Sequence, residues 1–183
     1  AIAGSININS ATAALPANIA FNNNSGVLSA RDSINLRNAD FDDKANLSIT
    51  GGDFLSNVVN LNGGRGEVDL HVNNVSGTVN STAYIVRLSS ASDITVGNTT
   101  ASGDPTIVST IGNVTITGNQ ITAGAPLSVI AYGNILTNPG ITISTSGGEV
   151  FMAAGVNIQD GGANWLVTGP ASPGGGFLDL RGV

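Results

Sequence analysis

The clearest copy of a repeated unit in this sequence reads Thr-Ile-Gly-Asn-Val-Thr-Ile-Thr-Gly-Asn-Gln-Ile-Thr-Ala, residues 110–123. Its centre alternates, so that Val114 and Ile116 point to one face of a strand and Thr115 points to the other. A Gly-Asn pair stands before this strand and another stands after it, which is typical of tight turns. The unit therefore predicts two short β-strands joined by a turn, with aliphatic side chains on one face.

Related triplets recur along the chain, and those in the middle of the series lie about twenty residues apart. They are Ile34-Asn35-Leu36, Leu47-Ser48-Ile49, Val68-Asp69-Leu70, Ile94-Thr95-Val96, Val114-Thr115-Ile116, Ile135-Leu136-Thr137, Val150-Phe151-Met152 and Phe177-Leu178-Asp179. Several are followed by a second apolar strand, which we expect to start at Phe41, Phe54, Val75, Ile121, Ile141 and Val156. Repetition at this period indicates units that stack on one another. We predict an all-β fold, a right-handed parallel β-helix (β-solenoid) with coils of about 20 residues.

Two other fold classes fit the sequence less well. Helices find little support, because Gly, Asn, Thr and Ser are poor helix formers and no window has apolar residues at helical spacing. An antiparallel sandwich would also have short strands, but its turn signals recur roughly every 8–12 residues. The repeat is least regular at residues 80–88 and 98–109, where we expect loops that leave the solenoid.

We divide the 183-residue chain into one solenoid and two terminal segments. Residues 1–15 form an N-terminal strand, which is either the first coil or a detached segment that joins subunits. Residues 16–168 form the β-solenoid. Residues 169–183 form a linker rich in Gly and Pro, followed by a final strand or cap.

Charge and cysteine content narrow the classes of function. The chain has 12 acidic and 6 basic residues, so it lacks the basic stripe that nucleic acid binding needs. No apolar run reaches the roughly 18 residues of a membrane span. The absence of cysteine and the small residues Ala-Ile-Ala-Gly-Ser at the start fit an exported protein cut by a signal peptidase. We therefore expect a secreted, extracellular protein.

Three stretches resemble the degenerate repeats of filamentous haemagglutinin-like bacterial exoproteins. They are Ser92-Asp93-Ile94-Thr95-Val96, Gly112-Asn113-Val114-Thr115-Ile116-Thr117 and Gly133-Asn134-Ile135. The similarity covers residues 30–160 and lies mainly in composition. The resemblance implies a right-handed parallel β-helix at the bacterial cell surface. It further implies a role in adhesion, surface coating, biofilm or fibre formation, without a cofactor.

Two groups of polar residues are candidate ligand sites. Asp40, Asp42 and Asp43, close to Asn38, supply oxygen atoms at a spacing that suits a calcium loop. They lack the glycine and the twelfth-position glutamate of an EF-hand, so we interpret the cluster as a solvated turn, with calcium as the alternative. His71 lies on an alternating strand, and a chain with one His and no Cys has few transition-metal ligands. We therefore expect His71 to be an outward-facing polar residue.

Parallel β-helices also include polysaccharide lyases and hydrolases, so carboxylates that share a face need attention. Glycoside hydrolysis requires two carboxyl groups flanking one bond. Asp69 and Asp93 occupy different positions within their triplets, so we predict no catalytic pair and no enzyme activity. Trp165 and Phe177 are large aromatics near the end of the predicted solenoid. We expect them either to cap that end or to contact another subunit.

The ends of the solenoid carry the functional prediction. Unpaired strand edges are templates for the addition of another chain. The segment 1–15 is apolar and uncharged, and it presents Ile2, Ile6 and Ile8 for such a contact. We predict a non-catalytic structural protein whose copies form a head-to-tail polymer or an adhesive rod. The first alternative is a module that binds surface glycans, and the second, which the sequence favours less, is a polysaccharide-degrading enzyme.

Overall fold

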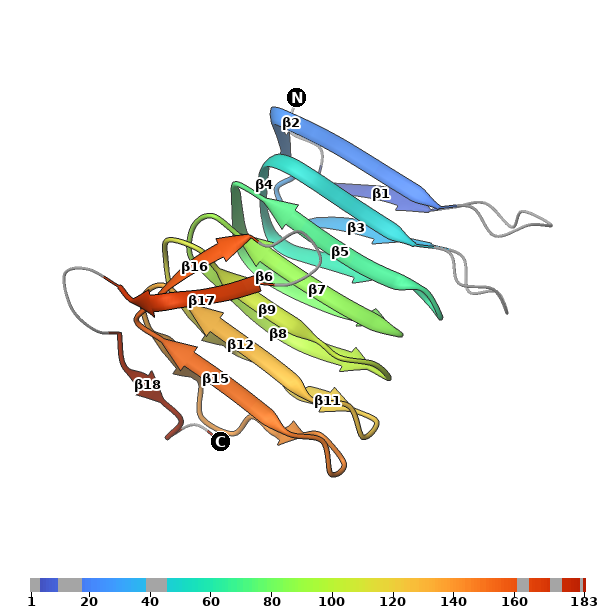
Figure 1. Ribbon diagram of the computed structural model, residues 1–183. Helices are drawn as coiled ribbons and strands as arrows, with labels where there is room; N and C mark the ends of the chain where they lie inside the picture. The colour runs from blue at the N-terminus through green and yellow to red at the C-terminus, as the bar shows by residue number, and fades with distance from the viewer. Residues whose placement is uncertain (1–3, 10–17, 39–45, 161–164, 172–175, 182) are drawn as a thin grey trace.

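The computed structural model describes residues 4–9, 18–38, 46–160, 165–171, 176–181 and 183 (Figure 1). About 67% of these residues are strand, and parallel strands stack in coils about 21 residues apart. The predicted parallel β-helix is therefore confirmed. Within the described ranges, no helix has the length and apolar character needed to cross a membrane.

One side of the solenoid, here called the lateral sheet, consists of parallel strands stacked along the solenoid axis. Its members in spatial order are β2 (Ile19–Ser29), β4 (Leu47–Asn62), β5 (Glu67–Val72), β7 (Ile85–Ser90), β9 (Thr106–Ser109), β12 (Leu127–Ala131) and β15 (Val150–Ala154). The long strands β2 and β4 contribute only their first parts, because both continue round a corner.

The second sheet is formed after the corner and is also parallel. It contains β1 (Ser5–Asn9), β3 (Ser33–Arg37), the last part of β4, β6 (Asn74–Ala83), β8 (Ile94–Ala101), β10 (Val114–Ile116), β13 (Ile135–Thr137) and β18 (Leu178–Asp179). The last residues of β8 also pair with β11 (Gln120–Thr122), which pairs with β14 (Ile143–Ser144).

Aliphatic side chains from the two sheets fill the interior. In the second sheet the strand register places Ile34, Val59, Val79, Val96 and Ile116 one above another, and all five are buried. Strands that pair by backbone hydrogen bonds lie about 4.8 Å apart, so each inward side chain packs against the like side chain of the next coil. This stacking explains why the triplets repeat along the sequence.

Glycine turns the chain at the first corner. Gly51 and Gly52 have φ of 74° and 68°, a conformation that is costly for other residues. The strands expected to start at Phe54 and Val75 form a short side of the first coils, residues 53–55 of β4 and 74–76 of β6. The second sheet follows this side, so these coils have three sides where the repeated unit predicted two strands. The prediction of loops at 80–88 and 98–109 is wrong, because most of these residues form parts of the strands β6 to β9.

Asparagine side chains form a row on the outer face of the second sheet, here called the asparagine ladder. Asn35 Nδ2 donates to Asn7 Oδ1 at 2.7 Å, and Asn60 Nδ2 donates to Asn35 Oδ1 at 2.7 Å. Asn80 Nδ2 donates to Asn60 Oδ1 at 2.9 Å, and the backbone N–H of Asn98 donates to Asn80 Oδ1 at 2.9 Å. Successive coils are therefore joined through side chains as well as through backbone.

A hairpin leaves the stack and crosses the outside of the lateral sheet (Figure 1). It consists of β16 (Val156–Asp160) and β17 (Trp165–Pro170), and β16 packs against β12. The strand predicted to start at Val156 does form, but it pairs antiparallel with β17 instead of stacking in a coil. Val108 and Ile130 point outward by register and are nevertheless buried, so they offer β16 an apolar surface outside the core.

Candidate functional site

Two rows of polar side chains stand on the outer face of the lateral sheet. Strand register places Arg87 between Asp69 and Thr106 in the first row. The second row contains Thr50, His71 and Ser89, also one above another. These side chains point outward because the intervening residues of each strand, such as Leu70 and Leu88, fill the core.

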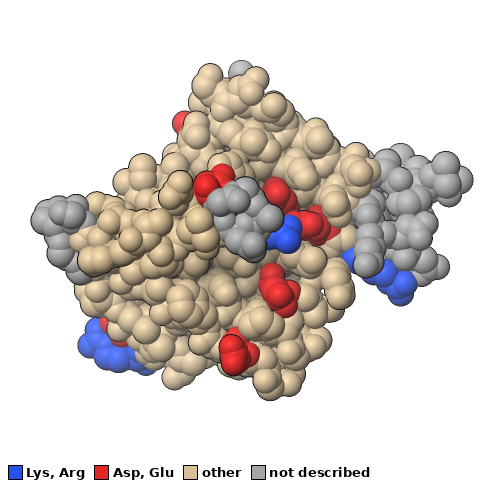
Figure 2. Space-filling model, viewed as in Figure 1, with Lys and Arg blue, Asp and Glu red and all other residues tan. Residues whose placement is uncertain are grey.

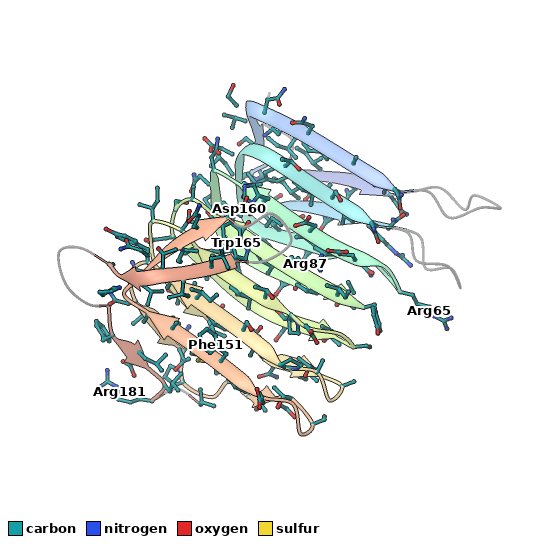
Figure 3. The ribbon with its side chains drawn as sticks, in the orientation of Figure 1. Arg65, Arg87, Phe151, Asp160, Trp165 and Arg181 are labelled. Atoms are coloured by element: carbon teal, nitrogen blue, oxygen red, sulfur yellow. The ribbon has the colours of Figure 1, made fainter. Side chains whose placement is uncertain are left out.

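The hairpin brings an aromatic ring to these rows. Trp165 begins β17 and pairs with Asp160 at the end of β16. Its indole stacks on the imidazole of His71, with ring centroids 5.7 Å apart and an angle of 12° between the planes. Figure 3 shows Trp165 and Asp160 close to Arg87 on the same face. Residues from both the solenoid and the hairpin therefore build the site.

Ser89 fixes the orientation of His71. The Ser89 hydroxyl lies 2.9 Å from His71 Nδ1 and 3.2 Å from the carbonyl oxygen of Leu70. Both contacts are hydrogen bonds when Nδ1 carries a proton and donates to Ser89 Oγ, which then donates to Leu70. The imidazole plane on which Trp165 stacks is thus held by the neighbouring coil.

Charged groups surround the stacked rings of His71 and Trp165. The Arg87 guanidinium forms an ion pair with Glu67 of the preceding coil. Burial raises the pKa of the Asp69 carboxyl, and nearby Asp160 raises the same pKa further, while His71 lowers it. In Figure 2 acidic side chains gather around one basic side chain on this face of the molecule. The site as a whole is acidic.

Two adjoining hollows lie on this face. One has a volume of about 360 Å³ and is lined by Thr50, Asp69, His71, Arg87, Ser89, Asp160 and Trp165. The other has a volume of about 270 Å³ and is lined by Tyr84, Ile85, Arg87, Gly103, Asp104, Thr106 and Trp165. Arg87 and Trp165 are common to both hollows. The described residues contain no group of three His, Cys, Asp or Glu side chains arranged to hold a metal ion.

Both ends of the solenoid form a second candidate site. Among the described strands, β1 pairs only with β3 and β2 only with β4 at one end. At the other end β15, β14 and β18 each have one partner, β12, β11 and β13 respectively. Apolar residues that pack on the core from these end strands are only partly buried: Ile6, Ile8, Ile19, Phe21, Leu28, Ile143, Met152 and Ala154. Each end therefore presents backbone edges and apolar side chains together.

The structure places several of the predicted site residues. Ile6 and Ile8 lie on the edge strand β1 and face the core, while Ile2 lies outside the described residues. Phe177 is exposed, and its N–H donates to Asn134 Oδ1 at 2.9 Å next to the edge strand β18. That Ile6, Ile8, Trp165 and Phe177 contact another subunit stays a prediction. The calcium candidates Asp40, Asp42 and Asp43 also lie outside the described residues.

The structure also shows where Trp165, His71 and the two aspartates considered as a catalytic pair lie. Trp165 stacks over β5, an interior strand of the lateral sheet, so it does not lie across a solenoid end. His71 is exposed and points outward, as predicted. Asp69 and Asp93 are on different sides, because Asp93 precedes β8 of the second sheet and accepts the Asn113 N–H at 2.7 Å.

Sequence reasoning missed Asp160 as a neighbour of Asp69. The signal that could have revealed the hairpin is a break in alternation: Ile107-Val108 and Val129-Ile130 place two apolar residues side by side in one strand. Such pairs are typical of strands that are covered on both faces. They indicate a covering element over the lateral sheet, although they do not identify it.

No family model, curated protein or solved structure matches this chain. The structure is consistent with a β-helix repeat protein, as the resemblance implies. Membership of the filamentous haemagglutinin-like family stays a prediction.

Proposed function

We propose that this chain is a non-catalytic structural protein of the bacterial cell surface whose solenoids join head to tail outside the cell. The observation that carries the proposal is that the described strands leave both sheets open at both ends, with partly buried apolar residues beside the open edges. Open parallel edges recruit further strands. A second copy of the same chain supplies edges of the same kind.

The register of the two sheets predicts how copies would meet. If the lateral sheet continues, β15 pairs with β2 of the next copy and Met152 packs on Phe21, because both positions belong to the row of Ile49 and Val129. If the second sheet continues, β18 pairs with β1 of the next copy. Leu180, which is exposed and follows β18, then stands over Ile6. The second sheet contains one strand more than the lateral sheet, so a single translation along the axis continues either the lateral sheet or the second sheet.

The composition supports a place outside the cell. Asn, Ser and Thr supply most of the polar residues, only 10% of residues are charged, and no cysteine is present. The resemblance to filamentous haemagglutinin-like repeats points in the same direction. A fibre or a segment of an adhesive rod is the form of structural protein that an open solenoid suits.

Assembly is tested with two variants that each block one end. Ile6→Lys places a charge on the edge strand β1, and Met152→Lys places one on β15. We expect the wild type to form axial oligomers or fibres in sedimentation velocity and electron microscopy, and each variant alone to stay monomeric. An equimolar mixture of the two should form dimers only, because each variant keeps one working end.

The control is Ile121→Lys, which makes the same exchange at an exposed isoleucine on the outer face of β11. This variant should assemble like the wild type, and thermal unfolding establishes that all variants are folded. Monodisperse wild-type monomers at every concentration, or assembly unchanged by both end variants, would contradict the proposal.

The non-catalytic part of the proposal has its own test. Incubation of the protein with neutral and acidic oligosaccharides should release no new reducing ends and no unsaturated products. Turnover that Asp69→Asn abolishes would instead establish a polysaccharide-degrading enzyme.

A further inference from the structure

The two hollows on the lateral sheet take no part in joining the ends. Asp69 and His71 lie on β5 and Arg87 lies on β7, and both strands are paired on either side within the sheet. Axial stacking of copies would leave this face exposed along the side of every subunit. The hollows therefore need an explanation beyond assembly.

Aromatic surface is scarce in this protein and two of its rings stand here. Aromatic residues make up 4% of the sequence, which contains a single tryptophan. That tryptophan lines both hollows, and the exposed ring of Tyr84 lines one of them. Aromatic rings pack well against flat apolar surfaces, such as the C–H faces of sugar rings, while their polar edges remain hydrated. The stack on His71 holds the indole of Trp165 in place for such a contact.

The polar groups around the rings suit hydroxyl groups. Asp69 and Asp160 offer acceptor oxygens in the larger hollow, Asp104 offers them in the smaller one, and Arg87 offers donors to both. Hydroxyl side chains of Thr50 and Thr106 add groups that can donate or accept. A ligand hydroxyl, which also donates and accepts, can be satisfied by this mixture.

Charge selects between ligand classes. Four carboxylates stand in or beside the hollows, those of Glu67, Asp69, Asp104 and Asp160. They disfavour an acidic polysaccharide. Arg87 is already paired with Glu67, so it adds little repulsion toward a chain of ammonium groups. Such a chain offers no apolar ring face to Trp165 and Tyr84, whereas a neutral sugar offers that face together with hydroxyl groups for the carboxylates.

We propose that the two hollows bind a neutral oligosaccharide, with consecutive sugar rings on either side of Trp165 and Arg87. Their volumes, about 270 and 360 Å³, are near the lower end of the range of roughly 300–1,000 Å³ that holds small ligands. Each hollow is therefore suited to one ring. The shared wall makes a chain of sugars a better ligand than a single sugar.

The single tryptophan makes the site directly observable. Cellohexaose, N-acetylated chitohexaose and maltohexaose serve as neutral probes, with hexagalacturonate and hexalysine as charged ones. We expect saturable change in tryptophan emission with at least one neutral hexaose, matched by heat in titration calorimetry. The corresponding monosaccharide should bind at least tenfold more weakly.

Two variants locate the binding. Trp165→Ala should reduce the calorimetric affinity at least tenfold, whereas Phe151→Ala, at an exposed aromatic of the edge strand β15, should leave it unchanged. The proposal is overturned by absence of both signals with all three neutral probes, by tighter binding of either charged probe, or by unchanged binding in Trp165→Ala. None of these outcomes bears on end-to-end assembly, so the two proposals can fail separately.

Discussion

Gly77 meets two requirements at a single position. Its φ is +81°, and a Cβ at this site would collide with the carbonyl oxygens of Ser56 and Asn57 in the preceding coil. Gly140 has nearly the same φ, +80°, but open space where its Cβ would stand. The pair separates the conformational cost of a side chain from the cost of close approach between coils.

We predict that Gly140→Ala lowers the free energy of unfolding by about 1–2 kcal/mol, the cost of a left-handed conformation. Gly77→Ala should lower it by a further ~1–3 kcal/mol, because the crowded coils must also move apart. Urea unfolding of the two variants measures the difference. Equal losses would mean that coil spacing does not constrain position 77.

The raised pKa of the Asp69 carboxyl leads us to expect that stability depends on pH. Its pKa is raised mainly by burial and further by Asp160, so the folded protein keeps this proton at pH values where the unfolded chain has lost it. Ionisation of Asp69 therefore costs stability as pH rises above the usual aspartate value of about 3.9. The charged groups that face it are Glu67, His71, Arg87 and Asp160.

Asp69→Asn removes this cost. The variant should melt at a higher temperature than the wild type at pH 7, and the gap should close as pH falls below about 3.9, where Asp69 is protonated in both states. Thermal melts between pH 3 and 8 measure the gap. A gap that does not change with pH would contradict the burial of this carboxyl.

At the scale of elements, the asparagine ladder connects strands that are far apart in sequence. Asn60 both donates to Asn35 and accepts from Asn80. We predict that Asn60→Ala costs roughly 1–3 kcal/mol, the net value of two hydrogen bonds. Asn73→Ala, at an exposed asparagine outside the ladder, should stay within about 0.5 kcal/mol of the wild type. Chemical denaturation measures both losses, and equal losses would mean that the asparagine ladder does not stabilise the fold.

The hairpin depends on apolar residues outside the core. Ile130→Ser returns the outer row of the lateral sheet to the polar character that it has at His71 and Ser89. We expect faster hydrogen exchange in β16 and β17, with β5 and β7 unchanged, and a stability loss of roughly 2–5 kcal/mol, as for truncation of a buried isoleucine. Ile121→Ser makes the same exchange at an exposed site and should alter neither. Uniformly faster exchange in Ile130→Ser would show that the hairpin is not a separate unit.

The strands of the solenoid could be predicted because their signals are local. Alternation at Val114-Thr115-Ile116 and repetition at coil length are visible in the sequence, and both follow from stacking in register. The hollows could not be predicted in the same way. Asp160 and Trp165 reach Asp69 and His71 only because the hairpin folds back over several coils, and no local pattern encodes that path.

In the two proposals, copies of the whole molecule add along the solenoid axis and a ligand binds on its side. Its ends are open because each sheet stops at a strand that has one partner among the described strands. Its lateral hollows lie away from those ends, on strands that are already paired. Assembly would therefore repeat the hollows along a fibre, which gives many weak sites one combined affinity.

Cross-linking at the proposed joint is the sharpest test of head-to-tail assembly, because the chain contains no cysteine. Ala20 and Phe151 face outward in the same row of the lateral sheet, so continuation of that sheet places Ala20 of one copy beside Phe151 of the next. Neighbouring strands lie about 4.8 Å apart, a distance that a disulfide can span. Ala20→Cys combined with Phe151→Cys should give a series of covalent multimers under mild oxidation. The control combines Ala20→Cys with Leu166→Cys, which lies on the hairpin, and should give no covalent multimers. Monomers alone from the first pair, in a sample of the protein that remains folded, would contradict head-to-tail joining.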